Sequence, residues 1–77
     1  MPDTVLDTSG LACPLPVLKA KKAIAPLSPG DVLAVIATDP GSVADFEALC
    51  AALGHTLLSH SEADGVYRFR IAKGKPK

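Results

Sequence analysis

The run Val-Leu-Ala-Val-Ile-Ala, from Val32 to Ala37, decides the fold class of this chain of 77 residues. It is almost continuously apolar and has the length of a strand. Turn residues lie on both sides of it, Pro29-Gly30 before it and Asp39-Pro40-Gly41-Ser42 after it. Apolar runs of this kind are typical of central strands that are covered by helices. We therefore expect a sheet with helices packed against it.

The segments on either side of this strand predict two amphipathic helices. Before it, apolar residues recur at helical spacing from Pro14 to about Ala25, and the prolines and glycine between Pro26 and Gly30 end the helix. After it, a second apolar face runs from Val43 to Leu53, and Gly54 lies where a C-cap glycine belongs. The two faces consist of Val17, Ala20, Ile24 and Leu27, and of Val43, Phe46, Leu49, Cys50 and Leu53.

The ends of the chain supply the remaining strands. The segment from Thr4 to Ser9 is rich in β-branched residues and stops at Gly10. Near the C-terminus, Leu57-Leu58 and the run from Val66 to Ile71 predict a hairpin around the polar turn from Glu62 to Gly65. In its last strand Tyr67, Phe69 and Ile71 alternate with Arg68 and Arg70.

The element order β-α-β-α-β-β predicts an α/β (α+β) two-layer sandwich. Right-handed crossovers would place both helices on one face of a mixed four-stranded sheet. A chain of 77 residues suffices for one domain, and we expect residues 73–77 to form a frayed tail because none of them is apolar.

Composition limits the function classes. Eight basic residues balance eight acidic ones, so no net charge attracts nucleic acid, and no segment has the length of a membrane span. The N-terminus lacks the pattern of a signal peptide. We expect a monomeric cytoplasmic protein with free thiols.

Cys13 is the leading candidate for chemistry, because it lies at the predicted start of the first helix. A helix N-terminus lowers a thiol pKa from about 8.5 toward roughly 3.5–7.5. Pro14 and Pro16 remove no hydrogen bond of the helix but do remove two donors, which leaves the Leu15 amide within reach of the sulfur. We therefore expect a solvent-accessible Cys13 with a moderately lowered pKa. The alternative from the residues alone is a small buried cysteine before a helix.

The segment Gly-Leu-Ala-Cys-Pro-Leu-Pro-Val, from Gly10 to Val17, resembles the Cys-Pro-x-Pro signature of the TusA/SirA-like sulfur carriers. Further residues in the positions of the family pattern are Lys22, Pro29-Gly30, Asp39-Pro40, Asp45, Cys50, Gly54-His55 and Tyr67-Arg68. The resemblance implies a persulfide carrier that loads Cys13 from a cysteine desulfurase or rhodanese-like donor and passes the sulfur to an acceptor protein. Known destinations are tRNA thiolation, molybdenum-cofactor biosynthesis and dissimilatory sulfur oxidation. Ala12, where thiouridine-pathway members often have a basic residue, weakens the first of these.

Other polar residues have simpler explanations. Cys50 lies on an apolar helical face and is expected in the core. No spacing argument brings His55 or His60 to Cys13, and no ligand spacing predicts a metal or cofactor. The prediction is thus a carrier without its own small-molecule turnover.

Charged side chains leave two alternatives open. Lys19, Lys21 and Lys22 either dock a partner or are solvated helix residues, and Arg68 and Arg70 are either solvent-facing positions or a docking patch. A nucleic-acid-binding or regulatory module is the competing function, since the layout resembles the C-terminal domain of a translation initiation factor. Scarce aromatic residues argue against it, and the lack of a resolving cysteine argues against a thiol redox protein.

Overall fold

The computed structural model describes residues 4–12 and 15–74 and forms one sheet with two helices. The strands are β1 (Thr4–Thr8), β2 (Val32–Ala37), β3 (Thr56–Ala63) and β4 (Val66–Ala72), and the helices are α1 (Leu15–Ile24) and α2 (Ser42–Leu53). The order of elements is the predicted one.

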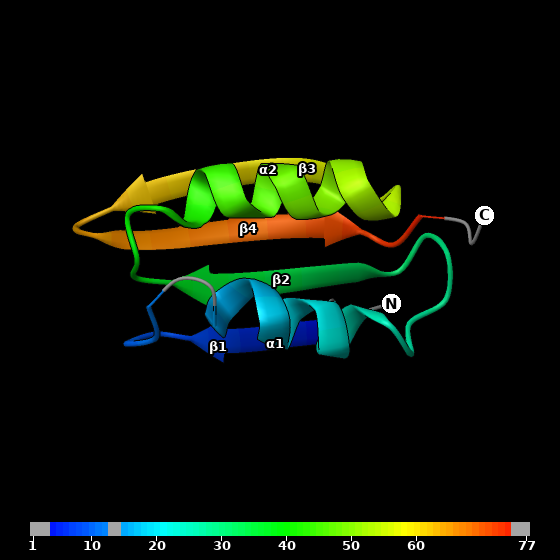
Figure 1. Ribbon diagram of the computed structural model, residues 1–77, viewed down its shortest axis with the longest axis horizontal. Coiled ribbons are helices and arrows are strands. Elements are labelled where there is room, and N and C mark those ends of the chain that lie inside the picture. The colour runs from blue at the N-terminus through cyan, green and yellow to red at the C-terminus, as the bar shows by residue number, and fades with distance from the viewer. Residues whose placement is uncertain (1–3, 13–14, 75–77) are drawn as a thin grey trace.

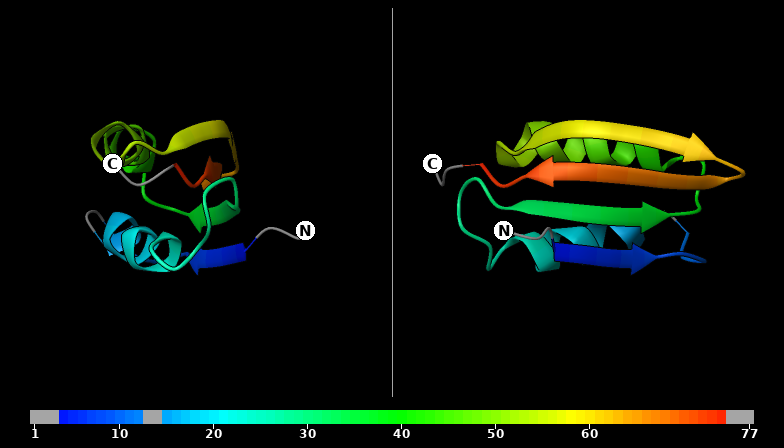
Figure 2. Two further views of the ribbon diagram at one scale, coloured as in Figure 1. Left: turned by 90° about the vertical axis from the view of Figure 1, so that its right-hand side faces the viewer. Right: turned by 180° about the vertical axis from the view of Figure 1, so that it is seen from behind.

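The sheet is mixed, with the strand order β1-β2-β4-β3. β1 pairs with β2 in parallel, whereas β4 is antiparallel to both β2 and β3. Both helices cover the same face, so the molecule has two layers (Figures 1 and 2). The fold class is therefore confirmed, with β2 in the interior of the sheet as its apolar run predicts.

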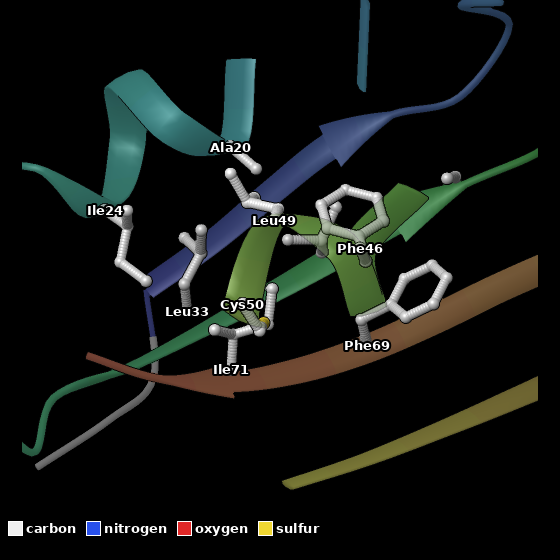
Figure 3. Close-up of a cluster of buried hydrophobic side chains, with 10 residues drawn as sticks. Ala20, Ile24, Leu33, Phe46, Leu49, Cys50, Phe69 and Ile71 are labelled. Carbon is white, nitrogen blue, oxygen red and sulfur yellow. The ribbon is translucent and has the colours of Figure 1, made fainter. Parts of the chain in front are cut away.

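The core lies between the helices and the sheet. Leu33, Val35 and Ala37 of β2 are buried in it. The Phe46 and Phe69 rings pack against each other there, tilted by 34° with centroids 4.6 Å apart (Figure 3). Its other buried apolar members are Ala20, Ile24, Leu49, Cys50 and Ile71. The alternation predicted for β4 is confirmed, because Phe69 and Ile71 are buried while Arg68 and Arg70 are exposed.

The hairpin differs from the prediction in length. β3 runs from Thr56 to Ala63, and the turn contains only Asp64 and Gly65, whose φ values are 52° and 79°. Two positive φ angles identify a type I′ turn, which matches the twist of the strands. Glu62 and Ala63, expected in the turn, belong to the strand because they pair with Tyr67 and Val66.

The expected frayed tail is wrong for its first two residues. Lys73 exchanges backbone hydrogen bonds with Gly30 and Asp31, and its Nζ donates to the Ile24 and Ala25 carbonyls at the end of α1. The Gly74 N–H donates to His55 Nδ1. Residues 75–77 lie outside the described residues.

Candidate functional site

The motif lies at the end of the sheet where the parallel strands β1 and β2 both finish. The loop after β1 leads into α1, and the loop after β2 leads into α2, so both helices begin at this end (Figure 1). Cys13 and Pro14 themselves lie outside the described residues. The predicted exposure of Cys13 and the effect of the helix on its pKa therefore stay predictions.

Hydrogen bonds fix the loop that precedes Cys13. The buried Thr8 hydroxyl donates to the Ile36 carbonyl at 2.6 Å, and the Gly10 N–H donates to Thr38 Oγ1 at 2.8 Å. Gly10 has a φ of 81°, a left-handed conformation that glycine adopts without strain. Two threonines at strand ends thus attach the motif loop to β1 and β2.

The turn before the loop is held by Asp7. Its carboxylate accepts a hydrogen bond from the Ser9 N–H at 2.9 Å. Hydrogen bonds from the Ser9 side chain and backbone hold the pKa of Asp7 below its ordinary value. The Leu11 N–H then donates to the Thr8 carbonyl, which reverses the chain direction after β1.

On the other side of the motif, Pro16 anchors the first turn of α1. Its side chain is fully buried, and Ala20 and Ile24 follow it on the same face at intervals of four residues. The Leu15 N–H donates to the Ala12 carbonyl at 2.9 Å. The Leu15 amide, which was expected to lie within reach of the sulfur, thus has a backbone acceptor, while Cys13 lies outside the described residues.

The outer face of α1 combines apolar and basic side chains. Leu15 and Leu18 are 46% and 49% exposed, so two large apolar side chains lie on the solvent-facing side of the helix. Lys19, Lys21 and Lys22 are exposed around them. All five lie within nine residues of Cys13 in the sequence, so the first helix after Cys13 presents a mixed apolar and basic surface.

The second cysteine and the histidines lie elsewhere. Cys50 is buried in α2, as predicted, and burial raises the pKa of its thiol. His55 follows α2 at the end of the molecule opposite the motif (Figure 1). His60 is exposed on β3, with its ring centroid 6.3 Å from that of Phe69.

Sequence reasoning missed three polar residues near the motif end. Thr8 and Thr38 make the bonds described above, and only their positions at strand ends hinted at this. Ser42, the first residue of α2, is 1% exposed, and its Oγ has no hydrogen-bond partner among the described residues. A buried hydroxyl without a partner costs about 1–3 kcal/mol.

Two absences hold for the described ranges, 4–12 and 15–74. These ranges contain no group of three or more His, Cys, Asp or Glu side chains that could hold a metal ion. Within the same ranges, neither helix is long and apolar enough to cross a membrane.

Comparisons with known proteins agree over nearly the whole chain. The model of the family described as sulfurtransferase TusA matches residues 4–73. The sulfur carrier protein TusA of Allochromatium vinosum is 52% identical over 71 residues, which make up 92% of this chain and 93% of that protein. A provisionally named sulfur carrier protein of Neisseria meningitidis is 57% identical over 67 residues, 87% of this chain and 90% of the relative.

The solved structures contain the same fold. The crystal structure of a SirA-like protein from Desulfitobacterium hafniense superposes with a TM-score of 0.81 and 31% sequence identity. The match covers 94% of this chain and 99% of that protein.

Proposed function

Because the chain belongs to the TusA sulfurtransferase family, we propose that it accepts sulfane sulfur as a persulfide on Cys13 and relays it to an acceptor protein. Relatives named sulfur carrier protein TusA support the carrier role. The observation that carries the proposal is the family match over residues 4–73, which includes the Cys-Pro-x-Pro motif.

The loading step is a displacement at sulfur. The Cys13 thiolate attacks the outer sulfur of a donor persulfide, the donor's S–S bond breaks, and the donor cysteine leaves as a thiolate. A new S–S bond forms on Cys13, so no external oxidant or reductant is needed. Delivery repeats the same displacement, with the acceptor's nucleophile attacking the outer sulfur now carried by Cys13.

The partners are a cysteine desulfurase or rhodanese-like donor and a downstream acceptor, each of which must reach Cys13. The outer face of α1 supports such contacts, because Leu15 and Leu18 offer exposed apolar area and Lys19, Lys21 and Lys22 offer positive charge. Apolar area strengthens binding, while the lysines favour an acidic partner surface and faster association.

Sulfur loading tests the proposal directly. Incubation with a cysteine desulfurase and cysteine, or with a rhodanese and thiosulfate, should add one sulfur atom, about 32 Da, to Cys13. Mass spectrometry of peptides locates the added mass. Cys13→Ser should abolish loading, because a hydroxyl does not form a stable persulfide.

Cys50→Ser is the matched control. It should load like the wild type but lose about 1–3 kcal/mol of unfolding free energy, because it buries a hydroxyl among apolar side chains. If neither donor loads the wild type, or if Cys13→Ser loads equally well, the carrier proposal fails and the nucleic-acid-binding alternative becomes the one to test.

A further inference from the structure

The sheet face that the helices leave uncovered carries a groove of about 410 Å³. Its floor is aliphatic and comes from Val5 of β1 and from Ala34 and Ile36 of β2. Val5 is 65% exposed, whereas Ala34 and Ile36 are half-buried. Figure 2 shows this side of the sheet, with α1 and α2 on the opposite side.

Polar side chains of β3 and β4 form the groove's other half. Arg68 and Arg70 lie two residues apart on β4, so both point to this face. Their cross-strand partners on β3 are Ser61 and Ser59, whose hydroxyls add hydrogen-bonding groups beside the guanidinium groups. Asp7, the carboxylate nearest this face on β1, already accepts a hydrogen bond from Ser9 and does not line the groove.

This combination selects an anionic partner that also has apolar side chains. Guanidinium groups bind carboxylates in a bidentate manner, and the aliphatic floor favours a side chain such as leucine. A second copy of this chain would bring further arginines to the interface, while the groove lining in the described part of the chain contains no carboxylate to neutralise them. Single-stranded nucleic acid would meet an aliphatic floor, because the Phe69 ring is in the core. His60 also lines the groove, but it is the cross-strand partner of Phe69, so its ring points to the side of the sheet that the helices cover.

We infer that this groove binds an acidic segment of a partner protein, with a carboxylate on Arg68 and an apolar side chain on the floor. The surface lies on the face of the sheet opposite to α1. The inference therefore goes beyond the proposed function, and a partner held on the sheet face leaves the outer face of α1 open for a second protein.

Titration by nuclear magnetic resonance tests the inference on the full isotope-labelled chain. The probe is an acetylated peptide in which glutamate and leucine alternate, and the comparison peptide has serine in place of leucine. Amide shifts should concentrate in β3, β4 and the middle of β2, and the serine peptide should bind more weakly. Shifts confined to α1, or no binding at millimolar peptide, would overturn the inference.

Paired charge variants make the test specific. Arg68→Gln should weaken peptide binding about tenfold, the effect of one lost charge-assisted hydrogen bond, while Arg68→Lys, which keeps the charge but not the bidentate geometry, should weaken it less than Arg68→Gln does. Binding of Arg68→Gln as tight as that of the wild type would show that the peptide does not use the groove. Val5→Ser, at an exposed position, should weaken the leucine peptide selectively, and dispersed spectra verify that each variant is folded.

An oligouridylate supplies the remaining control. It carries negative charge without carboxylates or aliphatic side chains, so it should bind more weakly than the acidic peptide at the same ionic strength. Tighter binding of the oligouridylate through Arg68 would replace the acidic segment with single-stranded RNA as the occupant and overturn the inference. Sulfur loading of Cys13 is measured separately, so failure of either proposal is recognised independently.

Discussion

His55 connects the end of α2 with the last described residues of the chain. The backbone N–H of His55 donates to the Cys50 carbonyl at 3.0 Å. The Nδ1 atom of its ring accepts a hydrogen bond from the backbone N–H of Gly74 at 2.9 Å. An imidazole nitrogen accepts a hydrogen bond only when it carries no proton. Burial, and then the charge of Lys73, lower the pKa of His55, which agrees with a neutral ring.

This arrangement predicts a pH-dependent stability. The unfolded chain takes up a proton on His55 below its ordinary pKa of about 6.5, whereas the folded chain takes it up only at lower pH. The stability from this group is thus complete above about pH 6.5 and is lost as pH falls through the lowered folded pKa. Urea unfolding at several pH values between about 5 and 7.5 measures the slope.

His55→Asn is the control, because the asparagine oxygen can accept the same hydrogen bond but does not titrate. Between neutral and acidic pH, the unfolding free energy of the variant should fall less than that of the wild type. An unchanged decline would show that His55 contributes nothing to it.

Single residues also show how far the site could be predicted. The sequence placed Pro16 at a helix start, and its burial follows from the four-residue spacing to Ala20 and Ile24. The bond from Gly10 to Thr38 depends instead on the parallel register of β1 and β2, which sets Thr8 beside Ala37. Local sequence does not specify such a register, so this bond could not be inferred.

Among the elements, β3 was the hardest to predict. Only Leu57 and Leu58 indicated a strand, because the residues from Ser59 to Glu62 are polar. The structure explains this pattern, since β3 is an edge strand with little of its surface buried. Its pairing with β4, and not its own hydrophobic pattern, makes it a strand. Polar edge residues also discourage pairing with other chains.

The hairpin turn gives a prediction at this scale. Gly65 has a φ of 79°, and a Cβ there would meet no atom within 4 Å. Gly65→Ala should therefore cost about 1–2 kcal/mol of unfolding free energy through backbone strain alone. Asp64→Asn should change it by less than about 0.5 kcal/mol, because asparagine also tolerates the positive φ of a type I′ turn.

Urea unfolding of the two variants beside the wild type measures both effects. A loss in Asp64→Asn as large as that in Gly65→Ala would contradict the conformational explanation. It would indicate that side-chain contacts of the turn set its stability.

At the scale of the whole molecule, the layers and the interior position of β2 followed from the sequence. Three patterns in the sequence each predict residues of the same core, namely the apolar run of β2, the two helical faces and the alternation in β4. Their agreement specifies one arrangement of the layers. The end of the chain did not follow, because Lys73 and Gly74 lack apolar side chains and are held by hydrogen bonds. Such bonds leave no periodic signal in the sequence.

These bonds predict that the chain needs its residues up to Gly74. A variant ending at Ala72 loses the Lys73 backbone bonds to Gly30 and Asp31, the two bonds from Lys73 Nζ to the end of α1, and the Gly74 bond to His55. At about 0.5–1.5 kcal/mol for each bond, and less where solvent competes, the loss should be roughly 2–4 kcal/mol. A variant ending at Gly74 keeps all of them and should retain nearly full stability. Lys73→Met removes only the Nζ bonds, so its unfolding free energy in urea should lie between those of the two truncated chains. Equal unfolding free energies of the two truncated chains would show that Lys73 and Gly74 do not stabilise the fold.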